Sequence, residues 1–184
     1  MAIIGLKRPV YAIALDDSEG NITYSAGSVL AKAISLSSSP NLSDVKLYAD
    51  DMVAEALKNL TDVSLSLNVD DLTDEAKKDV LGLTIGTSGE IISRGDDTNP
   101  YIGLGIVAGV IRQGVRKWRG IWFSKVIFAY PSETFNTKGQ AIEFQTPTLE
   151  GTALVDSSGV WKTENTFDSE SQAIAYINGK AGII

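Results

Sequence analysis

Residues 139–155 read GQAIEFQTPTLEGTALV and contain the strand around which we interpret the rest of the sequence. Apolar and polar residues alternate over Ile142-Glu143-Phe144-Gln145, and this period of two is typical of a β-strand. Beyond Thr146-Pro147-Thr148 the apolar positions continue in the opposite register, at Leu149, Ala153 and Val155. Proline cannot donate to a β-ladder and lies at edges or bulges. The stretch therefore predicts one long strand, bent at Pro147, that passes from one packing environment to another.

Shorter alternating segments along the chain predict a mainly β protein. The clearest is residues 63–69, VSLSLNV, for which we expect one buried face and one wet face. A second, long hairpin is expected to turn near Gln113-Gly114. The remaining expected strands cover residues 11–15, 22–24, 30–36, 45–49, 101–112 and 117–130, and polar loops are expected at residues 16–21 and 37–41.

The expected strand at residues 117–130 is apolar on both faces. By parity, one face carries Trp118, Trp122, Val126 and Phe128, and the other carries Ile121, Phe123 and Ile127. A strand of this kind is covered on both sides. We therefore expect a helix, a second sheet or another subunit against each face.

Two helices are predicted from their capping signals. The first covers residues 72–82, where Thr73 suits the N-cap and Gly82 suits the C-terminal stop. The second is short and lies near the C-terminus, where Ser169 and Gln172 fit a capping box. Together these patterns predict a β-sandwich or half-barrel with one flanking α-helix over residues 1–155. Residues 156–184 are expected to form an extension with a short helix, packed on or near the same domain.

The composition excludes several kinds of chemistry. The 184 residues include no cysteine and no histidine, so thiolate chemistry and the commonest general base and metal ligand are missing. The N-terminal residues do not fit a signal peptide, and no run has the apolar length of a membrane span, so we expect no membrane insertion. The formal net charge is −7, and all of it lies in residues 1–92, which carry 14 acidic and 7 basic side chains. An acidic surface repels nucleic-acid phosphates.

Three sequence features resemble reactive sites but favour a structural interpretation. The glycines of residues 103–109, GLGIVAG, neither follow a strand nor open a helix, so they indicate close packing rather than nucleotide binding. The four Asp-Asp pairs, at residues 16–17, 50–51, 70–71 and 96–97, lack calcium-loop spacing and are typical of solvated turns. No Gly-x-Ser-x-Gly elbow is present. We therefore predict no catalytic residue, no metal and no cofactor.

Two segments are candidates for contacts between subunits. The segment 50–59, DDMVAEALKN, fits no strand and is expected to form a helical turn or a loop that leaves the sheet. The candidate contact residues in it are Asp50, Asp51, Met52, Val53, Glu55, Leu57 and Lys58. A basic cluster of Arg112, Arg116, Lys117 and Arg119 beside Trp118 could bind a single strand of nucleic acid or pair with the acidic half of a neighbour. Because the chain is acidic, we favour the neighbour.

The chain resembles the major tail proteins of long-tailed bacteriophages, in particular the phi13-type group from phages of Gram-positive bacteria. The similar stretches are collinear and extend to about Val155. They are Gly5-Leu6-Lys7 with Tyr11-Ala12, residues 33–37, 47–51, 63–69 and 101–105, Thr137-Lys138-Gly139, and residues 142–151.

This resemblance implies a tail-tube β-sandwich domain and a structural function. Six subunits would form a ring whose sheets join around a lumen, and the rings would stack into the tail tube. The implied partners are further copies of the chain, the tape-measure protein, the tail terminator and the distal tail or baseplate proteins. Phage DNA would pass through the lumen without specific binding. The resemblance also implies that residues 50–59 reach a neighbouring subunit or ring, in a virion made in the cytoplasm of the bacterial host.

Two other classes of function remain open from the sequence. A ring-forming tube protein of a secretion or contractile system would share the fold, because one fold serves many functions. A small ligand- or metal-binding β domain would use the clustered carboxylates instead.

Overall fold

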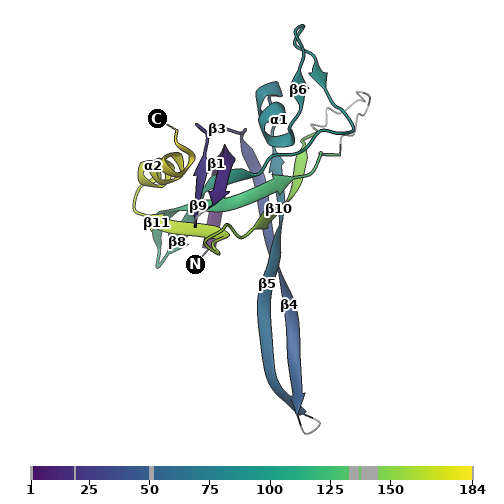
Figure 1. Cartoon of the computed structure of the whole chain (residues 1–184). Coiled ribbons are helices and arrows are strands. Elements are labelled where there is room, and N and C mark those ends of the chain that lie inside the picture. Colours follow the sequence, from purple (N-terminus) through teal and green to yellow (C-terminus); the bar gives the residue numbers. More distant parts are fainter. Residues whose placement is uncertain (1, 19, 50–51, 133–136, 138–144, 184) are drawn as a thin grey trace.

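The computed structural model describes residues 2–18, 20–49, 52–132, 137 and 145–183 and confirms the mainly β fold with a flanking helix (Figure 1). The strands are β1 (Ala2–Ser18), β2 (Asn21–Tyr24), β3 (Ser28–Val29), β4 (Ala33–Ala49), β5 (Met52–Val69), β6 (Thr84–Ile85), β7 (Ile91–Ile92), β8 (Ile102–Arg112), β9 (Val115–Phe128), β10 (Thr148–Leu154) and β11 (Lys162–Phe167). The helices are α1 (Asp74–Leu81) and α2 (Glu170–Ala181).

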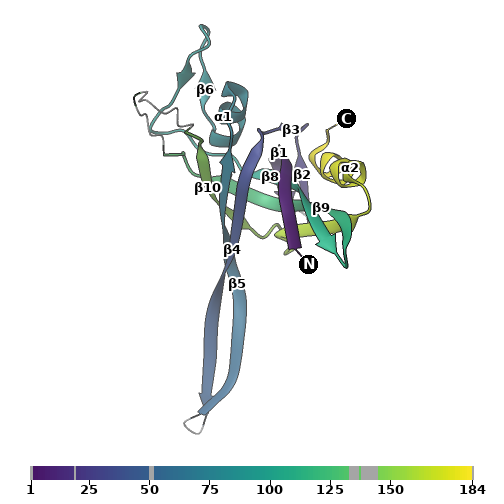
Figure 2. The same ribbon diagram turned by 180° about the vertical axis from the view of Figure 1, so that it is seen from behind.

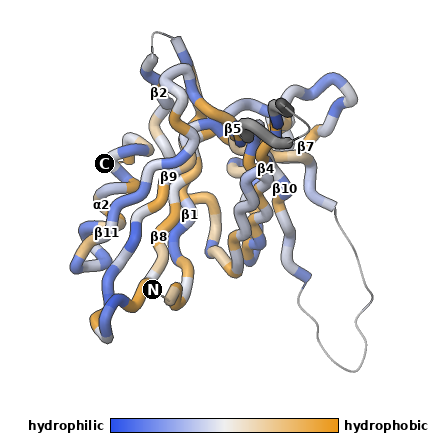
Figure 3. Tube along the Cα trace, turned by 90° about the horizontal axis from the view of Figure 1, so that it is seen from below, coloured by the Kyte–Doolittle hydropathy of each residue, from blue (hydrophilic) through white to orange (hydrophobic). Residues whose placement is uncertain are grey.

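One antiparallel sheet contains most of the strands. Its order is β2-β1-β8-β9-β10-β5-β4, with β11 also paired to β9 and β3 to β1, while β6 and β7 form a separate pair. The long strand β9 joins two halves, because it pairs with β11 over residues 118–123 and with β10 over residues 125–128. Figure 3 shows β4, β5 and β10 on one side of the molecule, and β1, β8, β9, β11 and α2 on the other.

A β-bulge in β9 lies where the two halves meet. Ile102 pairs with Val126, but Leu104 pairs with Phe123, so β9 contains one extra residue at this point. An extra residue reverses the direction of the side chains that follow it. Val126 and Phe128 therefore pack with Phe123 in one core, whereas Trp122 packs in another. The prediction that Trp118, Trp122, Val126 and Phe128 share a face was wrong, because simple parity does not reveal a bulge.

The larger core lies between the two halves of the sheet. It joins Leu104 and Ile106 of β8 to Leu65 and Leu67 of β5 and Leu149 of β10, all of which are 0–1% exposed. Helix α1 covers this core with Ala76, Val80 and Leu81. Its predicted caps are confirmed: the Thr73 side chain accepts from the N–H of Ala76, and Gly82 adopts the left-handed conformation.

A second core lies between α2 and the outer face of β1, β8 and β9. Trp122, which is 2% exposed, lies in this second core. It packs there with Val10 and Val107 of the sheet and with Ala173 and Ile177 of α2. A Cβ placed on Gly103 would lie 2.2 Å from the Trp122 ring, so this part of β8 requires a glycine. The packing interpretation of residues 103–109 is confirmed. The N-cap of α2 is Ser169, as predicted from the capping box.

Residues 145–155 of the stretch 139–155 can be compared with the prediction. Residues 138–144 lie outside the described residues, so the first part of the predicted strand stays a prediction. Residues 145–147 belong to no strand, so the prediction of one long strand that continues through a bend at Pro147 was wrong at this point. Beyond it, β10 starts at Thr148 and lies between β5 and β9 in the main sheet, with Leu149 and Ala153 fully buried and Val155 exposed. Pro147 thus stands just before the first paired residue, a position at which proline is tolerated.

Candidate assembly surfaces

The hairpin of β4 and β5 extends far beyond the rest of the sheet (Figures 1 and 2). β5 pairs with β10 only over residues 63–68, whereas β4 and β5 pair with each other along their whole lengths. From the Leu42–Leu60 pair outward, no third strand joins them among the described residues. We call residues 42–60 the arm. A two-stranded ribbon without a covering element is marginally stable in water, so a covering partner would stabilise the arm.

The structure of β4 and β5 shows that two expectations from the sequence were wrong. Residues Met52, Val53, Glu55, Leu57 and Lys58 belong to β5, not to a helical turn or loop, while Asp50 and Asp51 lie outside the described residues. Residues 37–41 form no loop either, because β4 runs through them without a break. The physical reason is cross-strand pairing, which outweighs local propensity in β-structure. Pro40 is tolerated because β4 is an edge strand.

Three apolar side chains of the arm are more than half exposed in the described chain. Val45 and Leu57 lie directly opposite each other on one face and are 59% and 58% exposed. Leu42, opposite Leu60 on the other face, is 54% exposed. Burying side chains of this size contributes roughly 1.5–3 kcal/mol each. The arm therefore presents exposed apolar side chains on both faces, with a pair of them, Val45 and Leu57, on one face.

The two ends of the main sheet are edges open to further strands. β4 forms one end, and β2 with β3 forms the other. An edge strand presents unpaired backbone N–H and C=O groups that can bind another strand. We call the part of the molecule outside the arm the body. The open edge of β4 continues from the body into the arm, so one neighbouring molecule could contact the body and the arm together.

The outer face of β4, β5 and β10 is lined by hydroxyl and amide side chains, and we call it the hydroxyl face. Its cross-strand rows are Ser35–Asn68–Thr148, Ser37–Ser66–Glu150 and Ser39–Ser64–Thr152. The side chains bond to one another: Asn68 donates to Thr148 Oγ1 at 2.8 Å, and Ser66 donates to Glu150 Oε1 at 2.7 Å. The wet face predicted for residues 63–69 is thus part of a wider polar surface.

The basic cluster is partly neutralised within the chain. Lys117 pairs with Asp168, and Arg119 lies 3.7 Å from a carboxylate oxygen of Glu164. Arg116 stacks over Trp118, with 4.5 Å between its guanidinium carbon and the ring centre. Arg112 and Arg116 are exposed near the β8–β9 turn. These two are therefore the members of the cluster best placed to meet a neighbour.

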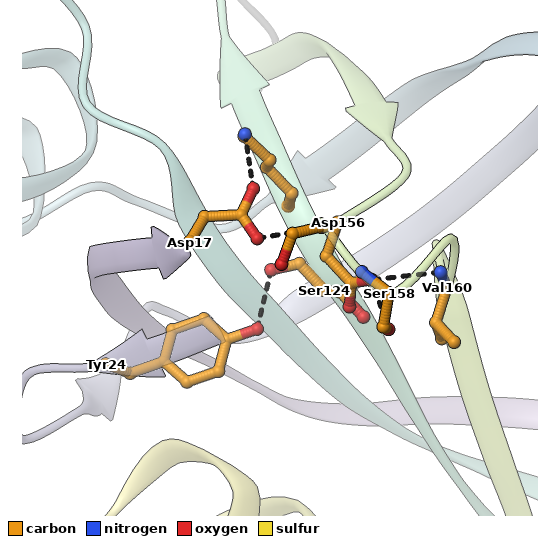
Figure 4. Close-up of polar contacts among 8 residues, drawn as sticks. Asp17, Tyr24, Ser124, Asp156, Ser158 and Val160 are labelled. Carbon is orange, nitrogen blue, oxygen red and sulfur yellow. Dashed lines mark hydrogen bonds and ion pairs between the residues drawn. The ribbon is translucent and has the colours of Figure 1, made fainter. Parts of the chain in front are cut away.

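A polar cavity of about 350 Å³ lies between the β1–β2 turn, the β9 bulge and the loop after β10. Tyr24, Ser124 and Asp156 are among the residues that line it, and Figure 4 shows their polar contacts together with those of Asp17 nearby. Tyr24 donates to the carbonyl of Ser124 at 2.6 Å, and burial raises its pKa to about 12. Asp17 accepts from Lys125 at 2.6 Å, and this bond holds the pKa of Asp17 below its ordinary value. These groups fasten the turn and the loop to β9.

Asp156 organises its own loop. One of its oxygens, Oδ1, accepts from the N–H groups of Ser158 and Val160, both at 2.9 Å, and from the Ser158 hydroxyl. Burial alone would raise the pKa of Asp156, but these hydrogen bonds outweigh it and hold the pKa below its ordinary value. These bonds give Oδ1 of Asp156 a structural role in holding the loop closed.

Asp156→Asn should weaken the fold at neutral pH by about 1–2 kcal/mol, the size expected for losing the charge from its hydrogen bonds. A depressed folded-state pKa stabilises the fold above the ordinary value and loses that effect as pH falls through the folded value. The stability gap between the two proteins should therefore close below about pH 4. Urea unfolding at several pH values measures it, and a gap that persists in acid would contradict this role for the charge.

Ligand and membrane sites were also sought in the described part of the chain. No group of three or more acidic residues there is placed to hold a metal ion. The Asp70 carboxylate accepts from the N–H of Lys32 and of Asp71, and so closes the end of β5. Neither α1 nor α2 has the length and apolar character needed to cross a membrane.

Comparison of the sequence with protein-family models and with curated proteins finds no match.

Proposed function

We propose that this protein is a structural, non-enzymatic subunit of a tube, namely the tail tube of a long-tailed phage. Six copies form a ring, and rings stack around a tape-measure protein between the tail terminator and the distal tail. The tube then conducts DNA into the host without binding it specifically. The protein is made in the host cytoplasm and ends in the virion.

The arm is the observation that carries the proposal. It combines a long ribbon that no other described element covers with apolar side chains on both faces, at Leu42, Val45 and Leu57. Contacts between subunits cover surfaces of this kind. The arm also points away from the body, so it can cross to a neighbouring subunit while the body keeps its own two cores (Figure 2).

The open sheet edges give secondary support. Identical subunits that associate head to tail use two different surfaces and close into rings when the rotation allows. β4 at one end and β2 with β3 at the other provide two such surfaces. The exposed Arg112 and Arg116 provide charge for a neighbour with an acidic surface.

Electron microscopy of the purified protein tests the proposal, together with sedimentation over a range of protein and salt concentrations. Rings or stacked tubes are expected, with the assembled fraction increasing with protein concentration. A monomer at every concentration and salt would overturn the proposal. The sequence of neighbouring genes separates a phage tail, with a tape-measure gene close by, from a secretion or contractile system.

A further inference from the structure

We infer that the hydroxyl face of β4, β5 and β10 lines the channel of the tube and is the surface along which DNA slides. This inference rests on the proposed function and adds to it the surface that meets the DNA.

The two outer faces of the sheet differ in whether a helix covers them. The outer face of β1, β8 and β9 is covered by α2, which buries Trp122 beneath it. The outer face of β4, β5 and β10 carries no helix among the described residues (Figure 3). Ser64 and Glu150 on this face are exposed. The larger core fills the space between the halves. The hydroxyl face is therefore the bare sheet surface that a channel wall requires.

The direction of the arm is consistent with this placement. β4 and β5 run without interruption from the body into the arm (Figures 1 and 2). If the arm reaches the next ring, both strands run along the stacking direction. If the open edges of the sheet also join neighbouring subunits in the ring, the faces of the sheet point towards or away from the tube axis. The larger core occupies one of these faces, which leaves the hydroxyl face as the free one.

The chemistry of the hydroxyl face suits a surface that must not hold DNA. Its described rows contain no lysine or arginine, and its charged member is the carboxylate of Glu150. Cationic side chains bind phosphates by releasing counterions, whereas a carboxylate repels them. Asn68 and Ser66 already donate to Thr148 and Glu150, and Asn41 donates to Ser64 Oγ at 3.0 Å. Side chains that bond to one another have fewer free donors for a phosphate.

The other outer side of the molecule carries cations, some of which are paired with carboxylates: Lys7 lies 3.0 Å from Glu170, and Arg119 lies 3.7 Å from Glu164. Lys7 and Arg116 both lie over the Trp118 ring there, at 5.2 and 4.5 Å from its centre. A channel wall carrying these cations would retain DNA at each passing phosphate. The charge distribution therefore favours the hydroxyl face for the channel and the α2 side for the exterior.

Single cysteines can test this placement, because the chain contains none. Ser64→Cys places a thiol on β5, the central strand of the hydroxyl face, and the control Ser171→Cys places one on the exposed side of α2. Each variant is assembled into tubes and treated with a small maleimide or with a maleimide attached to a large polymer. Dissociated subunits, in which both cysteines should react with both reagents, show that each thiol is reactive, and thermal unfolding of the same subunits shows that each variant is folded.

In tubes, we expect Ser64→Cys to react with the small reagent but not with the large one. Ser171→Cys should react with both reagents. Reaction of Ser64→Cys with both reagents would place the face outside and overturn the inference. Reaction with neither would place it between subunits and overturn it as well. Absence of rings and tubes from the unsubstituted chain would instead overturn the proposed function, and the inference with it.

Discussion

Replacing Val45 and Leu57 together by aspartate should abolish ring and tube formation while the subunit stays folded. The two side chains are more than half exposed in the single chain and lie outside both cores, so the body loses little. Burial in a neighbour is worth roughly 1.5–3 kcal/mol for each. Losing both weakens each contact by about 3 kcal/mol or more, which is about a hundredfold in affinity, and buried carboxylates add a further cost. Electron microscopy and sedimentation measure assembly, and thermal unfolding of the dissociated subunit measures the fold.

A matched control carries the same added charge at neighbouring positions. Ser43 and Asn59 also form a cross-strand pair on this face of the arm, next to Val45 and Leu57. Ser43→Asp with Asn59→Asp adds two carboxylates and removes no apolar side chain, so we expect tubes to form at moderate salt. Equal loss of assembly in both double variants would mean that charge, not apolar burial, governs the contact. Normal tubes from Val45→Asp with Leu57→Asp would contradict the assignment of the arm.

Gly103→Ala should destabilise the subunit by about 3 kcal/mol, at the upper end of the cost of overpacking a core. The added Cβ would lie 2.2 Å from the Trp122 ring and 2.8 Å from the Tyr24 ring. Trp122 cannot move away easily, because α2 packs on its other side and its indole N–H donates to the Tyr24 hydroxyl at 3.3 Å. Chemical denaturation, with Trp fluorescence as the signal, measures the loss.

Gly179→Ala provides the control for this effect. Gly179 lies inside α2, and a Cβ there meets nothing within 4 Å. Alanine in a helix interior is favoured over glycine by roughly 0.5–1 kcal/mol, so this variant should be more stable than the natural chain. A Gly103→Ala protein as stable as the natural chain would show that the close contact with Trp122 is not needed.

Elements with local signals could be predicted from the sequence. Helix α1 was found because its caps, Thr73 and Gly82, lie within ten residues of each other. The β8–β9 hairpin was found because its turn is marked by Gln113-Gly114, where both residues have positive φ angles of 50° and 77°. Such signals depend on the conformation of a few neighbouring residues, so they can be read before the fold is known.

Elements that depend on partners far away in the sequence were not predicted, or were predicted with the wrong structure. Residues 52–59 resemble a helical turn, and become a strand because they pair with residues 43–49. The strand β11 has little apolar alternation and forms against the first half of β9. The reversal between Trp122 and Val126 comes from a bulge that the pairing with β8 imposes. In each case the deciding partner lies elsewhere in the chain.

The amino-acid sequence by itself determined the mainly β character, both caps of α1, the N-cap of α2, the acidic balance, and a chemistry without histidine or cysteine. These properties follow from residue type and from spacing over a few positions. The fold determined the arm and the hydroxyl face. Ser37, Ser66 and Glu150 are far apart in the sequence, and they form one row because β4, β5 and β10 pair in a single register. A surface of this kind depends on long-range pairing, which no local pattern encodes.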